Sequence, residues 1–240
     1  MKRILCLYLL MGLFFVKVAT LEARIYVVSV GIANYKDKPL RLPVKDANAL
    51  KYVYDKNGDT QSTLITDEHA TKDNILQKIQ TTFSDTSEKD IVVLFFSGHG
   101  YQGGFCVYDG LLSYNAIRKA MATSKSKNKI IFADACYAGN MRQNRGSSNA
   151  QNSMKKSNVM LFLSSRSTET SLESPRMSNG YFTDALQRAL RGGADANHDR
   201  IITARELFTY VSQKVSSATS NRQHPVMWGK FPNDMPVITW

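Results

Sequence analysis

Cysteine is scarce in this sequence, which has three in 240 residues. Cys6 lies in an apolar stretch near the N-terminus, so only Cys106 and Cys136 remain for the rest of the chain. Two cysteines in a chain of this size exclude a disulfide framework. Each must therefore be a buried residue, one half of a single bridge, or a reactive thiol.

Acidic residues are also in the minority, with 20 Asp and Glu against 31 Lys and Arg and a net charge of +11. The basic residues are scattered and have no aromatic residues interleaved among them, so they indicate a solvated surface and no specific nucleic-acid partner. With 43% hydrophobic and 21% charged residues, the composition excludes a disordered chain. It suits one well-cored domain.

The apolar run at the N-terminus is too short to span a bilayer. "MKR" precedes "ILCLYLLMGLFFV", and Lys17 then interrupts the run. This pattern predicts a signal peptide over residues 1–23, followed by one domain over 24–240 that is exported, periplasmic or secreted, and free of the membrane. Loss of three basic residues and Glu22 lowers the net charge from +11 to +9. An uncleaved anchor is the alternative, because "VKVATLEA" has no clean small-x-small cleavage site.

Apolar strands alternate with helical patterns from Arg24 onward. This order predicts an α/β fold with a mostly parallel central sheet and helices on both faces. Strands are expected at 24–35, 62–67, within 90–100, at 129–139 and at 158–165, a short strand and turn at 103–110, and helices at 42–58, 71–83, 112–125, 180–193 and 203–217.

Two of the predicted strands end on chemically reactive residues. His99 follows one apolar strand and is flanked by Gly98 and Gly100, and Cys136 follows another in "IIFADACYAG". Ligands collect at the carboxyl ends of parallel strands, so a thiol and an imidazole there can act as nucleophile and base. Taken singly, a cysteine is usually a small core residue and a histidine a satisfied polar one. Their joint placement favours catalysis.

The stretches "FFSGHG" and "FADACYAG" resemble the two active-site motifs of the caspase-like cysteine peptidases, and the metacaspase branch more than the animal caspases. "KDANAL", "SSRSTETSLES", "GYFTDALQRALRGGADANHDR" and "RQHPVMWG" are similar to bacterial members in the same order. The resemblance covers nearly the whole mature chain and implies a caspase-like sandwich. In the animal signature the Cys follows its His by about 50 residues. Here the interval is shorter, and Asp134 replaces the first signature residue.

The resemblance implies a cysteine endopeptidase with Cys136 as nucleophile and His99 as general base and acid. The backbone N–H groups of Gly100 and Cys136 would form the oxyanion hole. No sequence position marks a third triad member. Protein or peptide substrates are the expected partners, no cofactor is expected to be required, and calcium is the one ion for which the sequence carries a motif.

Two acidic residues predict a preference for basic substrates. Asp134 lies on the same side of its strand end as Cys136 by the two-residue period, and Asp46 in "KDANAL" matches the second acidic pocket residue of the family. Together they are expected to bind a substrate Arg or Lys at the residue before the cleaved bond. The alternative is that Asp134 merely caps a turn.

The stretch "DANHDRIITARE", residues 195–206, has the ligand spacing of a calcium-binding EF-hand loop. Arg200 stands where such a loop favours Gly. A metal-free capping box formed by Thr203 and Glu206 is the alternative. The expected ligands are Asp195, Asn197, Asp199, the carbonyl of Ile201, Thr203 and Glu206.

The stretch 141–158 is polar and lacks an apolar period, which predicts a mobile loop beside the active site. Its basic residues suggest self-cleavage, and a plain flexible linker is the alternative. The function itself has two alternatives: a peptidase of different specificity, or a catalytically silent caspase-like binding module. The expected cleavage positions are Arg142, Arg145, Lys155 and Lys156.

Overall fold

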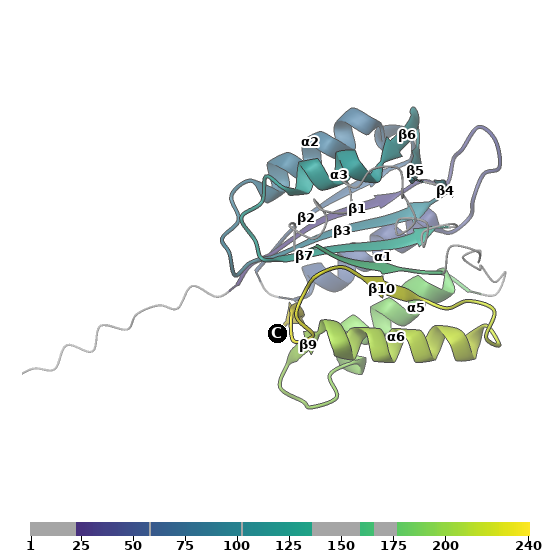
Figure 1. Ribbon diagram of the computed structural model, residues 1–240. Helices are drawn as coiled ribbons and strands as arrows, with labels where there is room; N and C mark the ends of the chain where they lie inside the picture. The colour runs from purple at the N-terminus through teal and green to yellow at the C-terminus, as the bar shows by residue number, and fades with distance from the viewer. Residues whose placement is uncertain (1–22, 58, 102, 136–158, 166–176) are drawn as a thin grey trace, which may run out of the picture.

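A mostly parallel six-stranded sheet forms the centre of the fold, in the strand order β10-β8-β7-β3-β1-β2 (Figure 1). Only β10 runs antiparallel to its neighbour. This computed structural model describes residues 23–57, 59–101, 103–135, 159–165 and 177–240. The strands are β1 (Ile25–Gly31), β2 (Thr60–Thr66), β3 (Ile91–Gly98), β7 (Asn128–Ala135), β8 (Val159–Leu163) and β10 (Val226–Trp228).

The central strands are apolar because both of their faces are covered. Every residue of β1, β3 and β8 is buried. Successive side chains point to opposite faces of the sheet, and in β3 Val93 and Phe95 enter one core while Leu94 and Phe96 enter the other. The sheet thus separates two hydrophobic cores, as the predicted fold requires.

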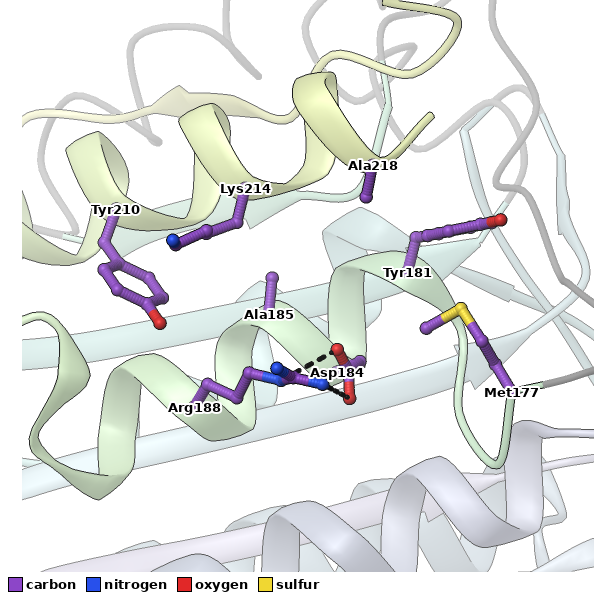
Figure 2. Close-up of a pocket in the computed structure, with 8 residues that line it drawn as sticks. All are labelled: Met177, Tyr181, Asp184, Ala185, Arg188, Tyr210, Lys214 and Ala218. Carbon is purple, nitrogen blue, oxygen red and sulfur yellow. Dashed lines mark hydrogen bonds and ion pairs between the residues drawn. The ribbon is translucent and has the colours of Figure 1, made fainter. Parts of the chain in front are cut away.

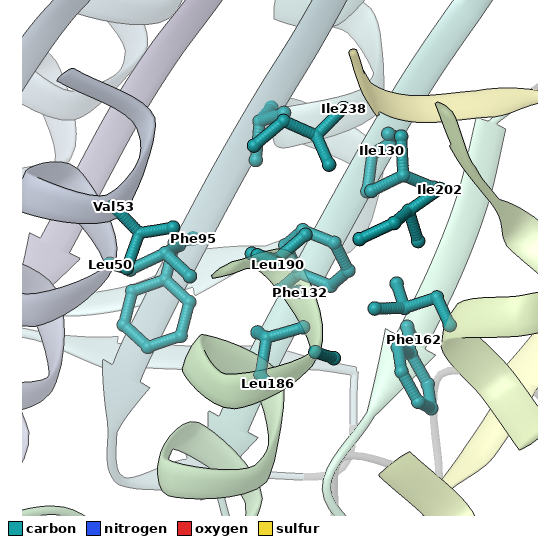
Figure 3. Packing of buried hydrophobic residues seen from close by; sticks show 14 of the residues in the cluster. Leu50, Val53, Phe95, Ile130, Phe132, Phe162, Leu186, Leu190, Ile202 and Ile238 are labelled. Atoms are coloured by element: carbon teal, nitrogen blue, oxygen red, sulfur yellow. The ribbon is translucent and has the colours of Figure 1, made fainter. Parts of the chain in front are cut away.

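Helices cover both faces of the sheet. One core contains α1 (Pro43–Asp55), α5 (Tyr181–Arg188) and α6 (Ala204–Ala218), and Figure 3 shows part of its packing. The other core contains α2 (Lys72–Phe83) and α3 (Tyr114–Met121). The predicted α/β fold with helices on both faces is confirmed.

Local capping fixes where two of the helices begin. The side chain of Thr71 accepts a hydrogen bond from the N–H of Asn74 at 3.3 Å, as expected for the N-cap of α2. Thr203 and Glu206 form a reciprocal capping box at the start of α6. The capping box, which is the alternative to a calcium site in this segment, is therefore present in the structure.

Three regions differ from the sequence expectation. The helix expected at 180–193 ends at Arg188 and continues as one π-helical turn, Ala189–Gly193, in which Gly192 has φ of 100°. The stretch around 103–110 forms a three-stranded sheet of β4 (Gly100–Tyr101), β5 (Gly104–Val107) and β6 (Gly110–Ser113). A further pair joins β9 (Ile201–Thr203) to β11 (Pro236–Thr239). These strands are too short for their periodicity to mark them.

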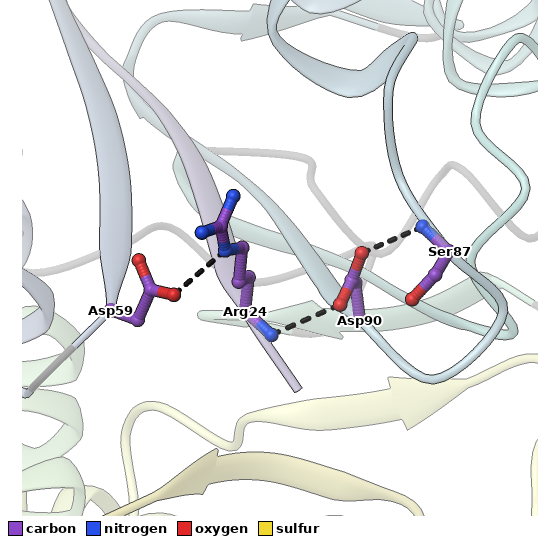
Figure 4. A network of polar contacts seen from close by, with 4 residues as sticks. All are labelled: Arg24, Asp59, Ser87 and Asp90. Atoms are coloured by element: carbon purple, nitrogen blue, oxygen red, sulfur yellow. Dashed lines mark hydrogen bonds and ion pairs between the residues drawn. The ribbon is translucent and has the colours of Figure 1, made fainter. Parts of the chain in front are cut away.

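Polar contacts fix the start of β1 (Figure 4). The N–H of Arg24 donates to Asp90 at 3.0 Å, and its guanidinium contacts Asp59 at 2.7 Å. The N–H of Ser87 donates to the other oxygen of Asp90 at 2.6 Å. Most of the predicted signal segment, residues 1–22, lies outside the described residues. Within the described residues no helix has the length and apolarity needed to cross a membrane.

Candidate active site

The carboxyl ends of β3 and β7 lie side by side at one edge of the sheet. Ser97 pairs with Asp134, and Gly98 pairs with Ala135. Neighbouring strands are about 4.8 Å apart, so the chain leaves both strands at adjacent points. The next residue after Gly98 is His99, and the next after Ala135 is Cys136. Cys136 itself lies outside the described residues.

The imidazole of His99 is partly exposed and contacts a backbone carbonyl. Its Nε2 lies 2.7 Å from the carbonyl oxygen of Lys38. A carbonyl oxygen only accepts hydrogen bonds, so Nε2 must carry the proton in this contact. In the neutral ring this leaves the lone pair on Nδ1, and Nδ1 is therefore the nitrogen available as a base.

Tyr35 holds the backbone of His99 in place. Its hydroxyl accepts the His99 N–H at 2.9 Å and donates to the carbonyl of Cys106 at 2.9 Å. The Tyr35 and His99 rings are 4.5 Å apart between centroids. Burial raises the pKa of the Tyr35 phenol, which keeps the hydroxyl protonated and able to donate. The histidine is thus positioned by a second aromatic residue.

The segment that carries Tyr35 and Lys38 is itself held by the end of β2. One carboxylate oxygen of Asp67 accepts the N–H groups of Ala33 and Asn34 at 2.8 and 2.9 Å. Lys38 has φ of 59°, a conformation that a residue with a side chain rarely adopts. Uncommon backbone conformations of this kind cluster at functional sites.

Gly98 is required by a close approach of Tyr35. A Cβ atom at Gly98 would lie 2.4 Å from the Tyr35 hydroxyl, far inside contact distance. From the sequence, the glycines beside His99 are expected to let the chain approach something closely. At Gly98 the approaching group is this tyrosine, which belongs to the protein itself.

Asp46 and Asp134 lie close enough for their charges to interact, although they are distant in sequence. Both are buried, with 2% and 6% of their surface exposed. Asp46 lies in the first turn of α1, and Asp134 lies near the end of β7. One oxygen of Asp46 accepts from the hydroxyl of Ser97 at 2.9 Å. The structure therefore brings the two predicted pocket residues together beneath the strand ends.

The start of α5 donates hydrogen bonds to both carboxylates. Asp46 accepts from the side-chain amide of Asn179 at 2.9 Å and from the N–H of Gly180 at 3.1 Å. Asp134 accepts from the hydroxyl and N–H of Thr183 at 2.7 and 3.3 Å. Negative charge is stabilised at a helix N-terminus, so α5 is well placed to hold this acidic pair.

Burial disfavours the ionised form of Asp46. Burial and, to a smaller extent, the nearby Asp134 raise the pKa of Asp46 to about 7, against the lowering effect of the Asn179, Ser97 and Gly180 hydrogen bonds. A cation placed between the two carboxyl groups would offset both the repulsion and the cost of burial.

Cys106 is a free cysteine and is unsuited to be the nucleophile. Burial raises the pKa of its thiol, which disfavours the reactive thiolate. Its backbone supports the site instead, because its N–H donates to the carbonyl of His99 at 2.9 Å.

The remaining predicted residues fall into two groups. The expected cleavage positions Arg142, Arg145, Lys155 and Lys156 lie outside the described residues, as does the loop 141–158. The candidate calcium ligands lie together on the loop that leads into α6. In the part of the chain that the structure describes, no three His, Cys, Asp or Glu side chains already gather closely enough to hold a metal ion.

A separate hollow of about 400 Å³ lies between α5 and α6 (Figure 2). None of the proposed site residues lines it. Its acidic residue Asp184 is paired with Arg188 on the same helix at 3.0 Å. The lining residues are Met177, Tyr181, Asp184, Ala185, Arg188, Tyr210, Lys214 and Ala218.

Sequence reasoning missed the residues that position the site. Ser97 stands in the quoted motif "FFSGHG", two residues before His99, and the two-residue period of a strand could have placed it on the same side as His99. Its pairing with Asp134 depends on the register between β3 and β7, which no local pattern gives. Tyr35, Asn179 and Thr183 reach the site through contacts between residues far apart in sequence. No local pattern signals them.

Comparison with known proteins gives a family and a fold. The family model for the caspase domain of C14 peptidases matches residues 24–235. No curated protein matches the sequence. A crystal structure of a protein from Geobacter sulfurreducens has 14% identity, a TM-score of 0.67, and coverage of 90% of this chain and 97% of that one.

Two caspase structures are also similar in fold. Caspase-1 from Spodoptera frugiperda has 18% identity, a TM-score of 0.63, and coverage of 88% of each chain. The structure of pro-sf-caspase-1 has 16% identity, a TM-score of 0.61, and coverage of 88% of this chain and 93% of that one.

Proposed function

The chain belongs to the caspase peptidase family, and on that premise we propose that it is an exported cysteine endopeptidase that cleaves after Arg or Lys. The observation that carries the proposal is the pairing of Ser97 with Asp134 and of Gly98 with Ala135. In this register Gly98, which precedes His99, and Ala135, which precedes Cys136, end neighbouring strands. The buried Asp134 and Asp46 lie next to these strand ends, which supports a role in binding substrate.

The proposed chemistry begins with a proton transfer from the Cys136 thiol to Nδ1 of His99. The thiolate attacks the scissile carbonyl carbon, and the negative oxygen that forms accepts hydrogen bonds from the N–H groups of Gly100 and Cys136. The imidazolium then gives its proton to the departing amine. This leaves a thioester on Cys136.

Water completes the reaction. His99 takes a proton from the attacking water, hydroxide adds to the thioester carbonyl, and the acid product leaves as the sulfur recovers a proton from the imidazolium. The contact with Lys38 supports this role, because it holds the proton on Nε2 and leaves Nδ1 for both transfers. Tyr35 restrains the histidine backbone throughout.

Substrate choice is proposed to depend on Asp46 and Asp134. A guanidinium or ammonium group reaching the pair would meet two carboxylates that share one site, and charge-assisted hydrogen bonds to such groups are the strong ones. Because α5 holds both carboxylates in place, less freedom is lost when the substrate binds. The charge of the pair favours a basic side chain over a neutral one.

Self-processing in the 141–158 segment is part of the proposal. The segment is part of the connection between Ala135, where β7 ends, and Val159, where β8 begins, and β7 and β8 are neighbouring parallel strands. Cleavage after Arg142, Arg145, Lys155 or Lys156 would leave β7 and β8 paired in one sheet. The two fragments would therefore stay associated.

A peptide-library digest with the purified mature protein tests the proposed function. We expect cleavage after Arg and Lys by the wild type, none by Cys136→Ala, and nearly wild-type rates for Cys106→Ala. Cleavage after acidic or apolar residues would point to a different specificity. If neither the library nor a peptidyl-Arg chloromethylketone reacts with the folded protein, the silent binding module becomes the better account.

A further inference from the structure

We propose that the loop 195–206 binds one calcium ion, with Asp195 at its centre. Asp195 is buried, with 8% of its surface exposed, and its Oδ1 has no hydrogen-bond partner among the described residues. Its Oδ2 accepts the N–H of Arg200 at 3.1 Å, so the carboxyl group faces into the loop. A buried carboxylate oxygen without a donor is costly, and a cation is the partner that would satisfy it.

The backbone of the loop has the turn that a calcium loop needs. The sixth position of an EF-hand loop favours Gly because the chain turns sharply there. Arg200 occupies that position and nevertheless has φ of 66°. Arg200 thus adopts the backbone conformation for which a calcium loop favours Gly. The substitution of Gly by Arg costs energy at this position but does not prevent the turn.

The oxygen-bearing residues of the loop stand at the positions that supply ligands in an EF-hand loop. Asn197 Oδ1 accepts the N–H of Asp199 at 3.1 Å, and Asp199 Oδ1 accepts the N–H of Ile201 at 2.8 Å. Asp195 is joined to the same loop through the Arg200 N–H. The other oxygens proposed as ligands come from the Ile201 carbonyl, Thr203 and Glu206, and calcium accepts six to eight such atoms in irregular geometry.

Glu206 already bridges the two ends of the loop. Its Oε1 accepts the N–H of Ala196 at 3.3 Å, and its Oε2 accepts the N–H of Thr203 at 3.0 Å. Calcium binding would turn this carboxylate toward Asp195 and give up the contacts of its Oε2 with the Thr203 N–H and the Thr203 hydroxyl, which now donates to it at 2.7 Å. The opposite half of the capping box, from the Glu206 N–H to the Thr203 hydroxyl at 3.3 Å, can remain.

The need to move Glu206 from Thr203 to the ion lowers the affinity that we expect for calcium. Because the three carboxylates do not already stand in metal-binding range, part of the binding free energy is spent on reorienting Glu206. We expect a dissociation constant of about 10⁻⁴–10⁻³ M, as in extracellular calcium modules. The loop contains β9 and runs into the first turn of α6, and β9 pairs with β11, so an ion there would stabilise this end of the domain.

The test is titration with calcium chloride of the mature chain carrying Cys136→Ala, which prevents self-cleavage. Calorimetry and melting temperature are measured on this protein, on the same protein with Asp195→Asn, and on a control with Asp85→Asn, whose carboxylate is exposed in the turn after α2. Magnesium chloride serves as the control ion. The readout is independent of peptidase activity, so the site and the proposed function can fail separately.

We expect saturable calcium binding with a rise in melting temperature, unchanged in Asp85→Asn and at least tenfold weaker in Asp195→Asn. Magnesium should give no comparable rise. If Asp195→Asn does not fold, Asp199→Asn decides, because Asp199 is exposed. Absence of saturable binding in the Cys136→Ala protein, or equal binding after substitution of the loop carboxylates, overturns the site.

Discussion

Two groups of carboxylates lie beside helix N-termini in this domain, and they are built in opposite ways. Asp46 and Asp134 are buried, come from α1 and β7, and meet the start of α5. The carboxylates of the 195–206 loop belong to the segment that leads directly into α6, and Asp199 is exposed. The first group is assembled by the whole fold, and the second by twelve consecutive residues.

The difference teaches what each group can bind. The buried pair is held by hydrogen bonds from Gly180, Asn179 and Thr183, so the positions of both carboxyl groups are fixed. Under the proposed function this would suit a planar or extended organic cation, which needs geometry as well as charge. The loop offers oxygen atoms at short sequence intervals that a spherical ion can gather.

Asp134→Asn should have the largest effect on substrate selection. Removing the charge is expected to lower kcat/KM for Arg and Lys substrates about ten- to a hundredfold, because a charge-assisted hydrogen bond contributes about 1.5–3 kcal/mol. Steady-state kinetics with paired Arg and neutral substrates measures it. Asp184→Asn, in the hollow between α5 and α6 and outside the proposed site, is the matched control and should leave the rates unchanged. Equal losses in both variants would remove the acidic pair from specificity.

The pKa of Asp46, raised by burial to about 7, predicts a pH dependence of substrate selection. As pH rises from 6 to 8 Asp46 gains negative charge, so the ratio of kcat/KM for Arg over citrulline substrates should rise, by up to about tenfold. Any ionisation that affects both reactions equally cancels in the ratio. Asp46→Asn should flatten the profile, and a ratio that stays constant in the wild type contradicts the assignment.

The same pKa fixes the sign of an effect on stability. Folding raises the pKa of Asp46, so the protonated form is favoured in the folded state. The resulting stabilisation is fully present below about pH 4 and is lost as the pH rises through about 7, at about 1.4 kcal/mol per unit of pKa shift. Thermal unfolding of wild type and Asp46→Asn across this range should therefore converge at low pH and differ at high pH.

Tyr35→Phe tests how far the proposed activity depends on the positioning of His99 by Tyr35. The change removes the hydroxyl that joins the His99 N–H to the Cys106 carbonyl. We expect kcat to fall about fivefold with little change in KM, because loss of a hydrogen bond costs about 1 kcal/mol and displaces the proposed base, not the substrate pocket. A proportional change in KM and kcat with a lowered melting temperature would indicate a purely structural role.

The smallest effect is expected for a substitution in the capping box of the 195–206 loop, because it breaks a contact between residues only three positions apart. Thr203→Ala removes the hydroxyl that accepts the Glu206 N–H and should lower the free energy of unfolding by about 1 kcal/mol in the absence of calcium. Thr209→Ala, at an exposed site in α6, is the matched control and should be nearly neutral. Chemical denaturation of the two variants distinguishes capping from a general preference for alanine in the helix.

The local elements of this molecule were predictable from sequence because their causes are local. The N-cap at Thr71 and the capping box at Thr203 depend on residues three positions apart, and the apolar strands carry their own pattern. The reactive strand ends could also be located, since parallel strands share an edge.

The supports of the candidate site were not predictable, because they join distant parts of the chain. Asn179 and Asp46 are separated by 133 positions, and the Tyr35 hydroxyl reaches His99 across 64. Only the resemblance to caspase-like peptidases indicated Asp46 at all. The sequence carries no pattern that would have connected Tyr35 with the histidine.

Labelling with a peptidyl-Arg chloromethylketone tests the central claim most directly, because it requires a reactive thiol and a site for a basic side chain at once. The account predicts stoichiometric labelling of Cys136 in the mature protein, located by mass spectrometry of its peptides. It also predicts no labelling in Cys136→Ala and much slower labelling by the citrulline analogue. Labelling at Cys106, or equal rates with both reagents, would contradict it.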